Sequence, residues 1–319
     1  MSNFFVSLLG QNQAVELLTQ AIVKNRIAPA YLFAGPDGVG RSLAARCFVA
    51  QIFCALLPTE RQQQIQHRLQ LGNHPDLLWI EPTYLHQGQR LSSAEAAAAG
   101  LKRKAPPLIR LEQVREIAQF LSRLPLEAPR SVVVIEQAEA MAEAAANALL
   151  KTLEEPGLAT IVLIAPSPES LLPTLVSRCQ RIPFHRLDLE GMTQILQQTE
   201  HAEILHHPSV LALAQGSPGA AIASWQQLQV IPPDLLQAIV FPPKSLKDVL
   251  ETARQIDKTL DTAAQLWLVD YLQHHYWQQV SLGQIQRFPL QQLEQARKSL
   301  LCFAQPRLVW ECTLLAMLQ

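Results

Sequence analysis

Short aliphatic runs alternate with helical patterns over the first half of the chain. The aliphatic runs are AYLFA (30–34), DLLWIEP (76–82), SVVVI (131–135) and TIVLIAP (160–166). Between them, apolar residues recur at helical spacing in the segments 5–30, 42–55, 111–124 and 142–156. Buried strands that alternate with helices predict a doubly wound α/β domain with a parallel sheet, spanning residues 1–185.

The pattern changes after residue 185. Short helices are expected over 186–228, a segment that closes with AQGSPGAAIASW (214–225). Long helical stretches without a strand pattern fill most of 229–319. We therefore predict a small helical lid over 186–228 and a separate all-α domain over 229–319.

Residues 84–107 interrupt the α/β domain with QGQ, SSAEAAAAG and KRKAPP, and show almost no apolar periodicity. This composition predicts a mobile insertion. Its basic run, Lys102, Arg103 and Lys104, could contact phosphate, but such a short run is more often only solvated.

Composition narrows the functional class. The formal net charge of -1 indicates no generally basic surface, which argues against a nucleic-acid-binding module that acts alone. The sequence has no run of about 18 apolar residues, so we expect no membrane span. We also expect neither a signal peptide nor a membrane partner. Five cysteines without a C-x-x-C pair suit a reducing cytoplasm.

GPDGVGRS (35–42) nearly matches the phosphate-binding pattern G-x-x-x-x-G-K-[ST]. Gly35, Gly38 and Gly40 let backbone amides turn toward a phosphate, and Ser42 would place a hydroxyl on magnesium. Arg41 stands where the pattern has lysine, and its planar guanidinium is not equivalent. The loop is therefore either a degenerate nucleotide site or a purely structural turn.

The residues that follow the SVVVI strand also bear on whether the chain can hydrolyse ATP. Active P-loop ATPases carry two acidic residues there, one for magnesium and one for the attacking water. Here Glu136 follows the strand and could contact a metal, but the next residue, Gln137, cannot act as a base. A solvated strand end is the alternative.

Four segments in this order resemble the bacterial clamp-loader AAA+ proteins of DNA polymerase III: the P-loop, SVVVI, AANALLKTLEEP (145–156) and LLPTLVSRCQRIPF (171–184). The resemblance covers residues 5–225 and implies a P-loop AAA+ domain, a helical lid and a helical collar domain. It implies a hetero-pentamer with gamma/tau-like and delta-like subunits that loads a sliding clamp onto primer-template DNA.

The resemblance also assigns roles to the SRC motif, Ser177, Arg178 and Cys179. In the family, this arginine enters the ATP site of the neighbouring subunit. Such an arginine finger contributes about 10³- to 10⁵-fold in rate. A surface ion pair is the alternative role for Arg178, and Cys179 is expected to be a packing residue.

Four positions depart from the hydrolysing members of the family, namely Arg41, Gln137, Ala165 and Gly219. All four predict a largely non-hydrolysing subunit, with a competent motor subunit as the alternative. ATP or ADP with magnesium remains open as a passive ligand. Zinc is not expected, because only Cys54 remains of the family's four-cysteine module and a structural site needs about four ligands; Cys47 and Cys54 should pack in the core.

Overall fold

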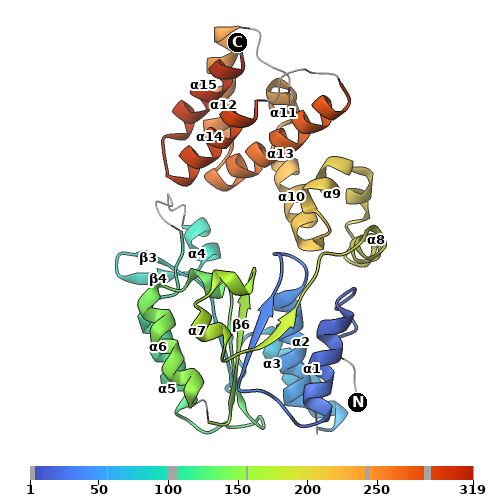
Figure 1. Ribbon diagram of the computed structural model, residues 1–319, viewed down its shortest axis with the longest axis vertical. Coiled ribbons are helices and arrows are strands. Elements are labelled where there is room, and N and C mark those ends of the chain that lie inside the picture. The colour runs from blue at the N-terminus through green and yellow to red at the C-terminus, as the bar shows by residue number, and fades with distance from the viewer. Residues whose placement is uncertain are drawn as a thin grey trace. The chain divides into compact units, whose positions relative to one another are not determined.

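The computed structural model describes residues 4–55, 57–99, 106–155, 157–240, 245–283 and 289–318. It contains two compact units, Met1–Gly191 and Met192–Gln319 (Figure 1). The first unit holds the predicted parallel sheet and the second is helical. No helix in the described part of the chain is both long and apolar enough to cross a membrane.

The first unit is built on a five-stranded parallel sheet in the order β2-β5-β6-β1-β7. The strands are β1 Ala30–Ala34, β2 Leu77–Ile80, β5 Ser131–Ile135, β6 Ala159–Ala165 and β7 Gln180–Pro183. The first four confirm the aliphatic runs. The fifth pairs with β1 and comes from the segment that carries the SRC motif.

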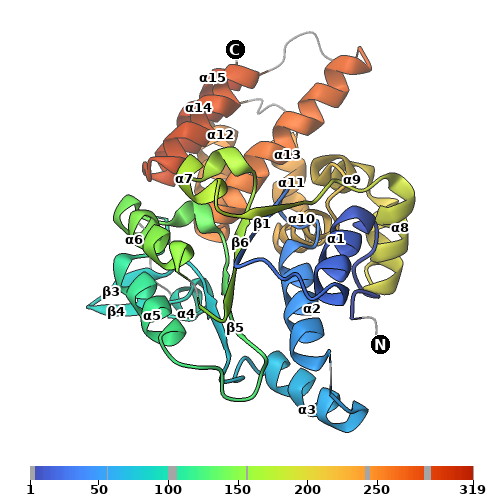
Figure 2. The same ribbon diagram turned by 60° about the horizontal axis from the view of Figure 1, so that its bottom comes forward.

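Helices cover both faces of this sheet (Figures 1 and 2). The helices of this unit are α1 Asn12–Val23, α2 Arg41–Cys54, α3 Thr59–Gln70, α4 Ser93–Ala98, α5 Leu111–Leu121, α6 Glu143–Glu154 and α7 Pro173–Val176. Alternate residues of β5 enter two different cores: Val132 and Val134 join the core with α1 and α2, whereas Val133 and Ile135 join the core with α5 and α6. This alternation explains why the strands are apolar on both faces.

The segment expected to be a mobile insertion is folded over residues 84–98. It forms the hairpin β3 Tyr84–His86 and β4 Gln89–Leu91, followed by α4. Gln87 and Gly88 both have positive φ, as a two-residue hairpin turn requires. Strands of three residues each are too short for an alternating pattern to show, so the sequence did not predict the hairpin. Lys102, Arg103 and Lys104 lie outside the described residues.

The second unit contains no strand in its described residues. Its helices are α8 Leu189–Gln198 (which begins in the first unit), α9 Pro208–Ala214, α10 Pro218–Val230, α11 Pro233–Val240, α12 Leu246–Thr259, α13 Thr262–Ser281, α14 Leu290–Leu301 and α15 Pro306–Met317. The helices α11 to α15 share one core, in which Trp310 is fully buried.

Candidate functional site

The Gly-rich loop joins β1 to α2, the context that the phosphate-binding pattern requires. Gly38 and Gly40 have φ of 74° and 102°, and α2 begins directly after Gly40. Gly35 serves a different purpose: a Cβ there would lie 2.4 Å from the carbonyl oxygen of Phe184. Its small size therefore lets the segment after β7 pass close to the loop. The backbone geometry fits a phosphate-binding turn.

Arg41 is turned inward, and only 8% of its side chain is exposed. Its Nη2 donates to the carboxylate of Asp37, which is 81% exposed. Its Nη1 is buried and has no hydrogen-bond partner among the described residues. A buried unpaired donor is costly, so this atom fits an anionic oxygen, although Asp37 already neutralises part of the charge.

Ser42, the candidate hydroxyl for magnesium, and Glu136, the carboxylate at the end of β5, lie in contact. The Ser42 hydroxyl donates to Glu136 Oε2 at 3.0 Å. Burial raises the pKa of Glu136, although this hydrogen bond and the charges of Arg41 and Arg46 oppose the shift. The contact places a hydroxyl and a carboxylate side by side beside the Gly-rich loop.

The other three departures lie in three different segments. Gln137 has left-handed backbone geometry and an exposed side chain. Ala165 ends β6 beside β1, and its carbonyl accepts a hydrogen bond from Gly35. Its methyl side chain offers no polar group to a phosphate. Gly219 lies on α10 in the second unit.

The SRC motif follows α7 and leads into β7. Arg178 is 39% exposed, its Nη2 donates to Glu154 Oε1 at 2.8 Å, and its Nη1 donates to the carbonyl of Thr174 at 3.0 Å. The Ser177 hydroxyl also donates to the Thr174 carbonyl. Burial raises the pKa of Cys179 to about 11, so its thiol stays protonated and packs against the core.

The sheet register separates Arg178 from the loop of its own chain. Strands β1 and β7 are parallel, with Tyr31 opposite Gln180 and Ala34 opposite Pro183. Arg178 precedes the amino end of β7, whereas the loop follows the carboxyl end of β1. The two candidate sites therefore lie at opposite ends of these neighbouring strands, and the structure does not bring them together.

Comparison with known families agrees with the architecture. A profile described as "DNA polymerase III, delta subunit" matches residues 10–188, and one described as "Cyanobacterial DNA polymerase III delta prime, C-terminal domain" matches 190–317. The chain belongs to the family of DNA polymerase III delta-prime subunits. The two matches cover both structural units, whereas the motifs that we identified in the sequence extend only to residue 225.

Individual delta-prime relatives support the family assignment. The delta-prime subunit of Bacillus subtilis is 33% identical over 56% of this chain and 48% of its own length. That of Pseudomonas aeruginosa is 36% identical over 60% and 54%. The alignments thus span about half the length of these relatives. A gamma subunit-related protein of Thermotoga maritima superposes with a TM-score of 0.52 at 19% identity, covering 96% of this chain and 98% of its own, which shows a shared fold.

Sequence reasoning missed the residues that hold the site residues in place. Asp37 was an unassigned position of the loop pattern, and Glu154 is separated from Arg178 by 24 positions, so no local spacing connects them. Cys47 and Cys54 are buried in the core, as predicted. Within the described ranges, no three His, Cys, Asp or Glu side chains gather as a metal site.

Proposed function

We propose that this chain is a delta-prime-like clamp-loader subunit that hydrolyses little or no ATP and supplies Arg178 to the ATP site of a neighbouring subunit. The separation of Arg178 from its own loop carries this proposal. An exposed guanidinium at the opposite end of the strands from the loop can serve another chain's phosphate but not that of its own loop. The family membership supports the same assignment.

The chain's own loop acts as a passive anion site in this proposal. Gly38, Gly40 and the unpaired Nη1 of Arg41 would hold a phosphate of ATP or ADP. Hydrolysis needs a magnesium ligand and a group that orients water. Glu136 could be the first, but Gln137 is an amide and cannot act as the base. Bound nucleotide would therefore stabilise the fold without turnover.

The proposed partners follow from the family. The delta-prime chain would assemble with gamma/tau-like and delta-like subunits in a cytoplasmic hetero-pentamer. This assembly would load the sliding clamp onto primer-template DNA. Within the chain, we propose that residues 186–228 act as the lid and 229–319 as the collar that joins the subunits.

The decisive experiment compares Arg178→Ala with Arg181→Ala in the reconstituted complex. Arg181 is exposed on β7 and provides a matched loss of one cation. We expect Arg178→Ala to lower turnover at the neighbouring ATP site by about 10³-fold or more, measured as clamp- and DNA-stimulated ATPase. Assembly, followed by size-exclusion chromatography, should survive in both variants.

Two results would contradict the proposal. Unchanged stimulated ATPase in an assembled Arg178→Ala complex would remove the role of this residue. Steady-state ATP hydrolysis by the isolated chain at about 1 s⁻¹ or faster, within the usual range of enzyme turnover, would instead identify a competent motor subunit.

A further inference from the structure

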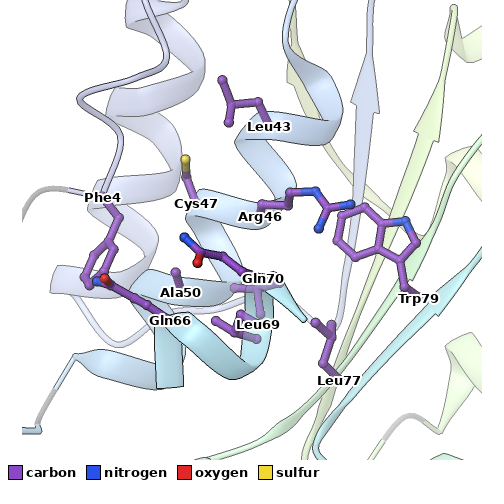
Figure 3. Close-up of a pocket in the computed structure, with 11 residues that line it drawn as sticks. Phe4, Leu43, Arg46, Cys47, Ala50, Gln66, Leu69, Gln70, Leu77 and Trp79 are labelled. Carbon is purple, nitrogen blue, oxygen red and sulfur yellow. The ribbon is translucent and has the colours of Figure 1, made fainter. Parts of the chain in front are cut away.

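A cavity of about 320 Å³ lies in the first unit (Figure 3), and no residue of the SRC motif lines it. The helices α2 and α3, strand β2 and the segment before α1 all contribute side chains to it. Much of the lining is apolar, including Cys47, Ala50, Leu69 and Leu77. Its volume is at the lower end of the range for ligand sites, about 300–1,000 Å³, which leaves room for one or two amino-acid residues.

Arg46 is the cationic side chain among the residues that line this cavity. The guanidinium of Arg46 lies 4.4 Å from the centre of the Trp79 ring, in a cation–π contact. Arg46 is exposed and makes no hydrogen bond or ion pair with any described residue. None of the eleven lining residues is acidic. The charge of Arg46 acts on Glu136, which does not line the cavity. The N–H groups at the edge of the guanidinium plane favour a carboxylate, which they bind in a planar, bidentate manner.

Two amides complete the polar part of the lining. Gln66 and Gln70 are one turn apart on α3 and both line the cavity. No described residue accepts or donates a hydrogen bond to either side chain. A side-chain amide both donates and accepts, so this pair can bind the N–H and C=O groups of a peptide backbone.

We propose that this cavity binds the C-terminal residue of a partner protein. The apolar side chain of that residue would fill the floor around Ala50 and Leu77, and its carboxylate would pair with Arg46. At a chain end, both groups stem from the same Cα, which matches a cavity with room for one or two residues. The preceding peptide group would reach Gln66 and Gln70. This proposal is independent of the arginine-finger role.

The test uses the full chain and a fluorescein-labelled peptide, Gly-Ser-Gly-Leu-Phe, with either a free C-terminal carboxylate or a C-terminal amide. Fluorescence anisotropy should show the free acid binding about ten-fold or more tightly than the amide, because a charge-assisted hydrogen bond is lost in the amide. Arg46→Ala should weaken binding of the free acid to the level of the amide, and Arg46→Lys should restore part of it.

Arg61→Ala is the matched control, because Arg61 is an exposed cation on α3 that does not line the cavity. It should leave peptide affinity unchanged. Equal affinity for acid and amide, unchanged binding by Arg46→Ala, or no binding of the free acid at millimolar concentration would each overturn the proposal. A concentration-dependent dimer of the chain that Arg46→Glu dissociates would also overturn it, by assigning the cavity to a second copy.

Discussion

Arg178 and Glu154 form an ion pair at the surface of the first unit, although 24 residues separate them along the chain. Glu154 ends α6 and Arg178 follows α7, so two helices fix the relative positions of the partners. With Thr174 binding a second nitrogen, the guanidinium is held at two points. Its remaining N–H groups stay available for an anion.

We predict that Glu154→Ala lowers the stimulated ATPase of the reconstituted clamp loader about two- to five-fold. The reason is lost orientation of Arg178, and an exposed ion pair contributes about 0.2–1 kcal/mol. The loss should fall on kcat rather than KM, because the finger acts in the transition state. Glu155→Ala is the control, since Glu155 is exposed and has no ion pair among the described residues. If Arg178→Ala lowers kcat but Glu154→Ala leaves it unchanged, the positioning role of Glu154 is refuted and the role of Arg178 is not.

Asp37→Asn should tighten nucleotide binding by the isolated chain. Asp37 competes with phosphate for the guanidinium of Arg41, and asparagine removes the competing charge while keeping the side-chain shape. We expect affinity for a fluorescent ADP analogue to rise about three- to ten-fold, the effect of one partly screened charge. Arg41→Ala should weaken it. Equal or weaker binding by Asp37→Asn would show that the loop holds no phosphate beside Arg41.

The strands of the first unit were predictable because burial on both faces leaves a run of aliphatic residues in the sequence. SVVVI is fully buried in β5, and AYLFA became β1. Two other features leave no such pattern. The hairpin at 84–91 depends on positive φ at Gln87 and Gly88, and β7 is only four residues long, with exposed Gln180 and Arg181.

Asp76→Asn should destabilise the first unit at neutral pH. Burial alone would raise the pKa of Asp76, but hydrogen bonds from the amides of Leu126, Glu127 and Ala128, at 2.7–2.8 Å, outweigh burial and lower it. Asparagine lacks the charge and one acceptor oxygen, so we expect a loss of about 2–3 kcal/mol in the free energy of unfolding, measured by urea denaturation.

The pH dependence of that loss has a definite sign. The pKa of Asp76 is lower in the folded state than the unfolded value of about 3.9, so its stabilisation is present above about pH 4. The stabilisation is lost as pH falls through the folded pKa, so the difference between wild type and Asp76→Asn should shrink as pH falls below about 4. Glu16→Gln, an exposed change on α1, is the control for loss of a surface carboxylate. A constant difference at all pH values would contradict the charged-acceptor explanation.

The residues of the candidate site also fall into those that the sequence predicted and those that it did not. A contiguous motif located Arg41, Ser42 and Arg178, because each belongs to a short segment of characteristic spacing. Ser42 and Glu136 were identified separately, from the loop pattern and from the strand end, and their hydrogen bond across 94 positions was not predicted. The partners Asp37 and Glu154 are fixed by three-dimensional packing alone, so no sequence pattern pointed to them.

The last prediction concerns the core of the second unit. Gln265 is buried on α13; its Nε2 donates to the carbonyl of Leu260 and its Oε1 accepts from Nε1 of Trp310, both at 2.9 Å. Gln265→Leu leaves both partners unpaired in an apolar core, and each unpaired buried group costs about 1–3 kcal/mol. We expect the free energy of unfolding to fall by about 2–4 kcal/mol in urea titrations followed by circular dichroism.

A double-mutant cycle distinguishes lost hydrogen bonding from poor packing. Trp310→Phe removes the N–H donor and leaves the oxygen of Gln265 unpaired, so it should destabilise by itself. In the double variant Gln265→Leu/Trp310→Phe neither of these two polar groups remains, and the combined loss should be about 1 kcal/mol or more smaller than the sum of the single losses. Additive losses would show that the two side chains act only through volume, and that this hydrogen bond does not stabilise the helical core.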